Sequence, residues 1–383
     1  MRYAELPLEV QTRRIASLDA LRGFNFIWIL GGEGVVLAVA QMCQGKAGTV
    51  EALGEFLHTQ ISHAEWDGFT FYDFIFPLFI FITGVSITLS LPRLIEREGR
   101  GGAYRRIIQR ALVLYVLGVI YYGGISQQWE DVRLVGVLQR IAVCYLAASV
   151  LFMHLKWRGL TAAVVVLLVG YWALMTFVPV PDTGAGVFAP DANLADWIDR
   201  NYLPGRLWHG THDPEGLLST LPAIGTCLIG VLCGLIITDE RLAPQRKSFV
   251  LIGAGIAMLA AGYLWSLQFP IIKAIWTSSF VLVAGGWSAI LLGVAYQIVD
   301  VWGYKAWATI LTWIGANAIL LYMLNDIIGF EPLARRIVGG DLAVSIDALT
   351  TVGTGRLLSH VLGLVFVVVL AGYLYRRKLF LRV

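Results

Sequence analysis

The chain has 383 residues, of which 57% are hydrophobic and only 14% are charged. A soluble domain of this length has no way to bury so much apolar surface, so the composition excludes a water-soluble globular fold and predicts an integral membrane protein. The formal net charge is only +3, and we expect no nucleic-acid partner.

A helix that crosses the hydrocarbon core needs about 20 mainly apolar residues. Runs of this kind lie near residues 20–42, 68–91, 107–125, 134–155, 160–179, 218–237, 248–269, 274–299, 306–329 and 357–375. We therefore expect an all-α integral membrane protein, a bundle of about ten transmembrane helices in a single domain over 1–383. The four cysteines mostly lie inside these runs, without metal-ligand or disulfide spacing, and are expected to fill the core.

The basic residues between these runs are distributed unevenly. With the N-terminus inside, the cytoplasmic connections and the tail hold Arg93, Arg97, Arg100, Arg105, Arg106, Lys156, Arg158, Arg241, Arg246, Lys247, Arg376, Arg377, Lys378 and Arg382. The opposite side holds fewer: Lys46, Arg133, Arg200, Arg206, Lys273, Arg335, Arg336 and Arg356. The positive-inside rule then predicts that both termini are cytoplasmic. Residues 1–14 are polar, so no cleavable signal peptide is expected.

Three connections on the predicted outer face are long, near residues 43–67, 180–217 and 330–355. Connections of this length are uncommon unless they are functional or disordered. The middle one is rich in aromatic residues, which favours folding against the bundle.

The first span carries charged residues, which are costly in lipid and usually face a partner or a polar cavity. Asp19 and Arg22 at its start form either a helix N-terminal carboxylate with an interfacial arginine, or a contact to an anionic ligand. Glu33 follows the pair Gly31 and Gly32, which predicts a close backbone approach or a break in the helix beside a cavity. We favour a functional role for Glu33.

Polar side chains also fall inside later spans, where each holds helices together or faces a cavity. They are Asp73, Gln139, Arg140, Asn317, Asn325 and Asp326. Their number favours a polar interior. By contrast, Gly230 and Gly234 form a small-xxx-small pattern that predicts a helix-packing contact.

Two further segments place titratable groups near span ends. His63, in HAEWDGFTFYDFIFP, is either an ordinary interfacial residue or a proton-transfer group, since histidine titrates near neutral pH. The segment 213–215, Asp-Pro-Glu, is typical of a helix start, and Glu215 can face a site as well. His209 and His212 lack further metal-ligand spacing, so no metal is predicted.

Five ordered segments carry a family resemblance. They are SLDALRGF (17–24), HAEWDGFTFYDFIFPLFIFITG (63–84), LVGVLQRIAVCY (134–145), DPEGLLSTLPA (213–223) and YRRKLF (375–380). Together they resemble the heparan-α-glucosaminide N-acetyltransferase family, specifically its short bacterial relatives. The resemblance implies a multi-pass protein of the bacterial inner membrane and is compatible with a homodimer.

The resemblance implies a transfer of acetyl from cytosolic acetyl-CoA to the amine of a glucosamine-like amino sugar on the other side of the membrane. The family's proposed active-site histidine, in a His-Ala-x-Trp-Asn-Gly motif, falls on His63. Its helper asparagine falls on Glu33, so the sequence departs from the family there. The family's large lumenal domain has no counterpart, so we expect a glucosamine or short amino-sugar acceptor rather than heparan sulfate.

Acetyl-CoA is large and anionic, so the resemblance also implies a channel that brings its thioester to the acceptor. Arg22 and Arg106 are candidates to hold its phosphates, although the positive-inside bias accounts for both. Further candidates for donor binding are Gln139, Arg140, Asn317 and Asn325.

Attack by an amine requires a base and stabilisation of the developing oxyanion. His63 is the expected base or acetyl carrier, Glu33 or Glu215 the orienting carboxylate, and Asp326 a further catalytic candidate. Direct transfer and an acetyl-imidazole intermediate both remain open, and we favour direct transfer.

Two other functions remain as alternatives. One is an O-acyltransferase that acts on envelope glycans or lipids, which would have the same topology. The other is a small-solute transporter, in which similar polar residues would line the permeation path. The sequence shows no repeated halves of the kind that many transporters contain.

Overall fold

The computed structural model describes residues 15–126 and 128–381. Within these ranges the fold is helical, with isolated β-bridges in the connections. The predicted lack of a signal peptide, on residues 1–14, and the basic residue Arg382 lie outside the described residues.

The first half of the chain forms a series of helices that runs from α1 to α7. They are α1 Ala16–Ile27, η2 Trp28–Gly32, α2 Glu33–Cys43, α3 Thr49–Ile61, α4 Phe71–Tyr121, η3 Gly124–Ser126, η4 Trp129–Asp131, α5 Val137–His154, α6 Trp157–Phe177 and α7 Leu194–Tyr202. The second half continues with α8 Thr220–Thr238, α9 Pro244–Trp265, α10 Ser278–Tyr296, η5 Gln297–Val301, α11 Ala308–Ala316, α12 Ala318–Ile328, α13 Phe330–Arg335, α14 Gly340–Leu349 and α15 Thr354–Arg376.

The longest helix, α4, folds back on itself. A straight helix of its 51 residues would be ~75 Å long. Yet Tyr72 at its start and Tyr122 just past its end line the same cavity. The backbone leaves helical geometry at Gly99, with φ 70° and ψ 176°, and a side chain would be strained there. Beyond the turn, Arg106 reaches back to Glu98 at 3.1 Å.

The described residues hold the expected number of spans. Eight helices are long and apolar enough to cross a membrane, and the pair α11 and α12, bent by 77° at its break, makes a ninth. The two arms of α4 on either side of Gly99 correspond to the predicted spans 68–91 and 107–125, which raises the number to ten. The prediction of an all-α bundle of about ten membrane helices is confirmed.

The first span is broken where its two glycines lie. A π-helical turn, η2, joins α1 to α2, and Gly31 has φ 137° inside it. This confirms the predicted break beside Glu33, which begins α2.

Close backbone contact joins the second span to the sixth. A Cβ at Gly230 of α8 would lie 2.0 Å from the carbonyl oxygen of Phe81 on α4, and one at Gly234 would lie 2.5 Å from the Thr88 hydroxyl. The predicted packing role of these glycines is confirmed. Three of the four cysteines, Cys144, Cys227 and Cys233, are buried, as expected for core residues.

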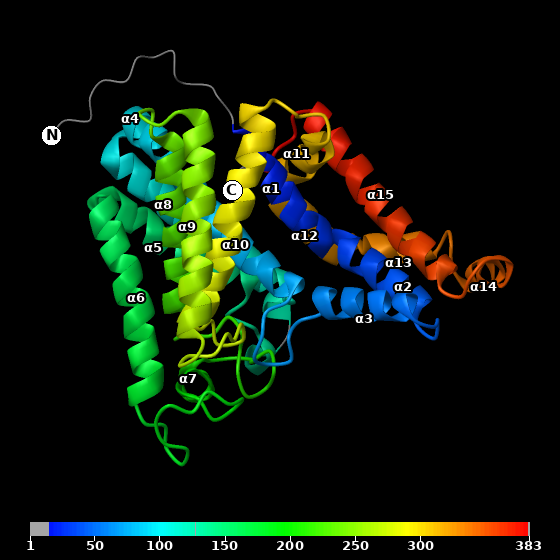
Figure 1. Cartoon of the computed structure of the whole chain (residues 1–383), viewed down its shortest axis with the longest axis horizontal. Helices are drawn as coiled ribbons and strands as arrows, with labels where there is room; N and C mark the ends of the chain where they lie inside the picture. Colours follow the sequence, from blue (N-terminus) through cyan, green and yellow to red (C-terminus); the bar gives the residue numbers. More distant parts are fainter. Residues whose placement is uncertain (1–14, 127, 382–383) are drawn as a thin grey trace.

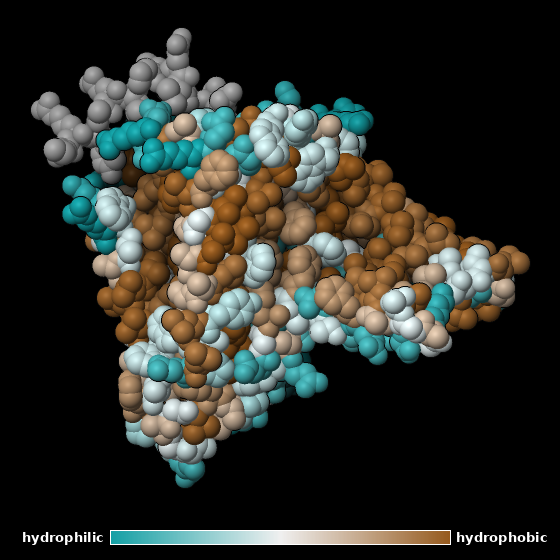
Figure 2. Space-filling view, viewed as in Figure 1, coloured by the Kyte–Doolittle hydropathy of each residue, from teal (hydrophilic) through white to brown (hydrophobic). Residues whose placement is uncertain are grey.

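On the face that Figure 2 shows, hydrophilic residues gather at two edges of the molecule, and a largely apolar belt separates them. The start of α1, the turn of α4, the α8–α9 connection and the end of α15 share one edge (Figure 1). The long connection that contains α7 lies at the other edge. The basic-rich connections thus gather on one side, while the assignment of that side to the cytoplasm stays a prediction.

The three long outer connections contain helices of their own. They hold α3, α7, and the pair α13 and α14. Figure 1 shows α2, α3, α13, α14 and α15 extending as an arm away from the bundle of α4, α5, α6, α8, α9 and α10. The α7 connection instead folds against the bundle, with Phe188 packed on Phe269 at a ring-centroid distance of 5.1 Å.

Candidate active site

A cavity of about 700 Å³ opens inside the bundle, towards the edge that carries the long connections. Segments far apart in the chain line it: α1, residues 63–66, both ends of α4, α5, the connection before α8, and residues 273–274. Its deeper wall is apolar, with Phe26, Phe79 and Ile141, whereas titratable and aromatic side chains gather near its mouth.

His63 is held at this cavity by the N-terminal cap of α4. Thr70 and Asp73 form a reciprocal capping box, which fixes Asp73 at the first turn. One oxygen of the buried Asp73 carboxylate, Oδ2, accepts from the Thr70 hydroxyl at 3.0 Å and from the backbone N–H of Ala64 at 3.1 Å. The other, Oδ1, lies 2.8 Å from Nδ1 of His63.

This pairing sets the tautomer of the histidine. An ionised carboxylate only accepts hydrogen bonds, so Nδ1 of His63 carries the proton that it donates to Asp73. Nε2 is then left as the basic nitrogen of the ring. A histidine oriented by a buried carboxylate in this way is suited to general-base chemistry.

A lysine from the connection between α9 and α10 completes this cluster. Nζ of Lys273 lies 3.3 Å from Oδ1 of Asp73 and 2.9 Å from Nδ1 of His63. In the sequence Lys273 counted only as one basic residue of an outer connection. No local pattern signals its contact, because it lies 210 positions from His63.

Glu33 reaches the cavity only through another side chain. The hydroxyl of Tyr72 donates to Oε2 of Glu33, and the Tyr72 ring lies 4.8 Å from that of His63. Glu33 therefore belongs to the same polar cluster but contacts the tyrosine rather than the histidine.

Glu215 belongs to a buried ion-pair network at the mouth. Arg133 donates to Asp213 at 2.7 and 3.1 Å and to Glu215 at 2.7 Å. Its guanidinium also lies over the rings of both Tyr122 and Trp208. Burial raises the pKa of Glu215 above its usual range. The sequence predicted the helix start at 213–215 but not the arginine that binds it.

The α7 connection packs further acidic groups behind this network. Asp199 accepts from the backbone N–H of Leu217 at 2.9 Å, and burial raises its pKa to about 6. Asp191, Asp196 and His212 have ligand atoms within 4.8 Å of one another. Asp196 is already bound by Asn193 at 2.7 Å, so the cluster is explained as part of the folded connection.

Three of the predicted donor-binding residues, Gln139, Arg140 and Asn317, are buried in the spans but do not line the cavity. Arg140 is buried, donates to the Ser219 hydroxyl at 2.5 Å and lies over the Trp276 ring. The amides of Gln139 and Asn317 are buried without a hydrogen-bond partner among the described residues. Gln139 lies against Gly118, and Asn317 sits at the break between α11 and α12.

The remaining predicted residues lie away from the cavity lining. Arg22 binds Asp19 at 3.0 Å and the Ser86 hydroxyl at 2.6 Å. Arg106 is exposed at the turn of α4. Asn325 and the exposed Asp326 lie in the last turn of α12.

One lining residue that the sequence analysis did not single out is Asn25. It is fully buried on α1, and neither atom of its amide has a partner among the described residues. It lies one turn of helix beyond Arg22, on the same face of α1. An unpaired amide in a cavity wall is available to bind a ligand.

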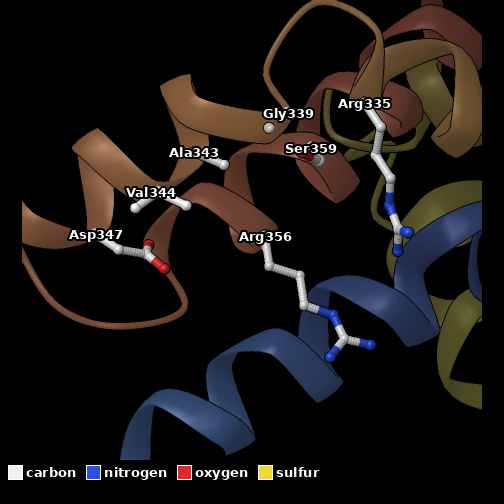
Figure 3. Close-up of a pocket in the computed structure, with 8 residues that line it drawn as sticks. Arg335, Gly339, Ala343, Val344, Asp347, Arg356 and Ser359 are labelled. Atoms are coloured by element: carbon white, nitrogen blue, oxygen red, sulfur yellow. The ribbon is translucent and has the colours of Figure 1, made fainter.

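A second hollow, of about 480 Å³, lies at the end of the arm (Figure 3). Arg335, Asp347 and Arg356 line it. Each is engaged by the protein: Arg335 by Glu331, Arg356 by Gln41, and Asp347 by the backbone N–H of Gly355. We assign it no role.

Together the fold and the cavity define a polytopic membrane protein with a histidine–carboxylate pair at an internal cavity. Residues 14–261 match the family model of the heparan-alpha-glucosaminide N-acetyltransferase catalytic domain. The chain belongs to this family, as its sequence motifs indicated.

Two relatives carry the same name. The chain is similar to heparan-alpha-glucosaminide N-acetyltransferase of Homo sapiens, with 28% identity over 323 residues, covering 69% of this chain and 48% of that protein. The Mus musculus protein of that name is 26% identical over 387 residues, covering 84% of this chain and 56% of that protein. The chain thus spans about half the length of these relatives.

Proposed function

We propose that the protein is a transmembrane N-acetyltransferase. It moves an acetyl group from cytoplasmic acetyl-CoA to the amine of a glucosamine-like amino sugar at the opposite face. The observation that carries this proposal is the His63–Asp73 pair, whose Nδ1 and Oδ1 atoms lie 2.8 Å apart at the cavity. Aromatic side chains line the mouth of this cavity, and apolar side chains line its interior.

His63 acts as the general base in this proposal. Nε2 takes a proton from the acceptor amine as its nitrogen attacks the thioester carbonyl; the C–N bond forms and the C–S bond breaks. The proton then passes to the departing CoA thiolate. The contacts favour Asp73 as the orienting carboxylate rather than Glu33, which binds Tyr72, or Glu215, which binds Arg133.

Asn25 is suited to bind the thioester. Its unpaired amide can donate to the oxyanion that develops on the carbonyl, a role that dipoles fixed in a dry site fill well. The apolar wall formed by Phe26, Phe79 and Ile141 suits the pantetheine arm. Arg22, one turn towards the basic edge, is proposed to bind the nucleotide phosphates.

The other donor-binding and catalytic predictions have less contact support. Arg106, Asn325 and Asp326 do not line the cavity. Gln139, Arg140 and Asn317 are buried but do not line it either. For these six residues, roles in donor binding or catalysis stay predictions.

The mouth of the cavity suits a sugar. Trp66 and Trp208 offer aromatic faces, and Trp208 is half exposed. Glu65 adds a carboxylate in reach of a cationic amino sugar before its amine is deprotonated. These groups support an amino-sugar acceptor, bound from the edge that carries the long connections.

The test compares wild type with His63→Ala, purified in detergent and supplied with acetyl-CoA and glucosamine. We expect the variant to bind acetyl-CoA but to lose at least ~100-fold in kcat, the usual scale of general-base catalysis. His58→Ala is the matched control, since His58 is exposed on α3 outside the cavity. Near-normal turnover by His63→Ala would refute the assignment of the base.

The same assay separates the functions. If the wild type acetylates only neutral sugars, the protein is an O-acyltransferase. If it does not bind acetyl-CoA at all, the transferase proposal fails and transport becomes the function to test. Acetylation of His63 by acetyl-CoA alone would support the acetyl-imidazole route over direct transfer.

A further inference from the structure

The connection between α9 and α10 holds a cation beside the proposed base. This segment lies beyond residues 14–261, the part of the chain that the family model matches. Its own backbone fixes it: Ile272 donates to the Thr277 hydroxyl at 3.0 Å, and Gly68 donates to the carbonyl of Ile271 at 2.9 Å. Residues 271–277 are thereby tied to the loop that carries His63.

The Trp276 side chain anchors the same segment from the other side. It is 1% exposed, and its indole N–H donates to the hydroxyl of Thr226 on α8 at 3.1 Å. Its own φ is 52°, a conformation rare for a bulky residue, so the turn is held by its surroundings. Lys273 is therefore presented to the cavity by a rigid turn and not by a mobile loop.

Both Lys273 and His63 donate to one carboxylate. Asp73 Oδ1 lies 3.3 Å from Nζ of Lys273 and 2.8 Å from Nδ1 of His63, and the two nitrogens are 2.9 Å apart. Nζ of Lys273 also lies 3.3 Å from Nε2 of His63, the nitrogen that keeps a lone pair and can accept a hydrogen bond from the ammonium. With the imidazole neutral, the cluster of Asp73, Lys273 and His63 carries no net charge.

We propose that Lys273 is a positioning residue for the reaction: its ammonium, paired with Asp73, keeps His63 neutral, and hence basic, at pH values where an isolated histidine–aspartate pair would hold a proton. This inference rests on the proposed function only for the role of His63 as the base. Burial lowers the pKa of Lys273 itself, and the adjacent Asp73 carboxylate opposes that shift.

The physical basis is the cost of a second positive charge. A carboxylate next to a histidine favours the imidazolium and raises its pKa, whereas an adjacent cation disfavours it. Lys273 therefore offsets the effect of Asp73. During transfer, the same repulsion favours passage of the proton from the imidazolium to the CoA thiolate.

Other titratable groups surround the cavity, but their contacts lie elsewhere. They are Glu65 of the His63 loop, Tyr72 of α4 with Glu33 of α2, Arg133 paired with Asp213 and Glu215, and His209 and His212 of the connection before α8. Among the described residues, the ion pairs and hydrogen bonds of the His63 side chain are made with Asp73 and Lys273.

The test measures the pH dependence of His63 in wild type, Lys273→Met and Lys273→Arg, with Lys305→Met as a control on an exposed lysine. Two readouts are followed. One is kcat/KM for acetyl transfer against pH. The other is the rate at which diethylpyrocarbonate modifies His63, followed by peptide mass, which needs no turnover and reports the neutral imidazole.

In Lys273→Met we expect both profiles to shift to higher pH by about one unit, because the loss of the cation stabilises the imidazolium. On the acid limb of the profile this shift lowers kcat/KM by about tenfold, while the plateau at high pH stays within a few fold of the wild-type value. Lys273→Arg retains the charge and should retain the wild-type profile in both readouts, as should Lys305→Met.

An unchanged pH profile for His63 in Lys273→Met would overturn the inference. If that variant does not fold, Lys273→Gln is measured in its place, with the same expectation. If the wild type transfers no acetyl, the proposed function fails, yet the diethylpyrocarbonate titration still decides whether Lys273 sets the protonation of His63.

Discussion

At the scale of single residues, Arg133 organises the outer part of the cavity. It is 5% exposed, binds two carboxylates, and lies over two aromatic rings. Asp213, one of the two, also accepts from the backbone N–H of Trp208 at 3.0 Å. The arginine thus joins η4, the connection before α8 and the mouth of the cavity into one rigid unit.

Arg133→Met should destabilise the protein strongly, because it leaves Asp213 and Glu215 as uncompensated buried charges. Removal of one partner of a buried ion pair typically costs about 3–5 kcal/mol. Burial already raises the pKa of Glu215, so it takes up a proton at a higher pH than an exposed glutamate does. Lowering the pH protonates it and should recover part of the loss.

Thermal unfolding in detergent at pH 7.5 and pH 5 measures this prediction. Arg336→Met is the control, because Arg336 is exposed on the arm. Equal unfolding temperatures for Arg133→Met and wild type would show that the network contributes nothing to stability.

The residues that meet at the candidate site could be predicted from sequence only in part. His63 was found because a short motif carries it, and Asp73 was found as a polar residue inside a span. Their pairing, and the contact with Lys273, arise when segments far apart in the chain meet. Periodicity and local spacing describe neighbours within one element, so they hold no information on such contacts. Asn25 and Arg133 were missed for the same reason.

At the scale of elements, the spans themselves were predictable because lipid requires long apolar helices. The two arms of α4 were separated correctly by the basic residues between them, although helical geometry continues almost through the turn. The helices α3, α7, α13 and α14 were not predicted. They are short, and in the outer connections no apolar run marks them.

The contact of α4 with α8 depends on glycine. Gly230→Ala places a methyl group 2.0 Å from the backbone carbonyl oxygen of Phe81, so the two helices must separate. Overpacking of this kind typically costs about 1–3 kcal/mol. Because the first arm of α4 begins with the cap that holds Asp73, we also expect reduced acetyl transfer.

Gly253→Ala is the matched control, since a Cβ at Gly253 of α9 meets nothing within 4 Å. It should leave the protein as stable as wild type or slightly more so, because alanine favours a helix over glycine. Thermal unfolding of both variants decides the point. Equal stability of Gly230→Ala and Gly253→Ala would mean that the α4–α8 interface relaxes without cost.

At the scale of the whole molecule, the two edges differ in what they hold. One carries the basic connections, the start of α1 and the end of α15; the other carries α7, the long connections and the mouth of the cavity (Figures 1 and 2). The proposed function needs this polarity, because acetyl-CoA is available in the cytoplasm and the acceptor binds at the opposite face. Arg22 lies on α1 between Asn25 and the basic edge, which is the edge from which the donor would enter in this proposal.

Cysteine labelling in intact bacterial cells tests this orientation. In a Cys43→Ser background the remaining cysteines are buried. A membrane-impermeant maleimide should label Tyr202→Cys, at the exposed end of α7, in intact cells. It should label Arg241→Cys, in the exposed α8–α9 connection, only after the cells are permeabilised. The positive-inside rule predicts this result from the charges alone.

The reverse labelling pattern would have a mechanistic consequence beyond topology. It would place the mouth of the cavity, with Trp208 and His63, in the cytoplasm, where donor and acceptor could enter by the same opening. The protein would then acetylate a cytoplasmic amine without any need for a path across the membrane. The orientation therefore decides whether the ten spans serve to carry an acetyl group across the bilayer or only to hold the site within it.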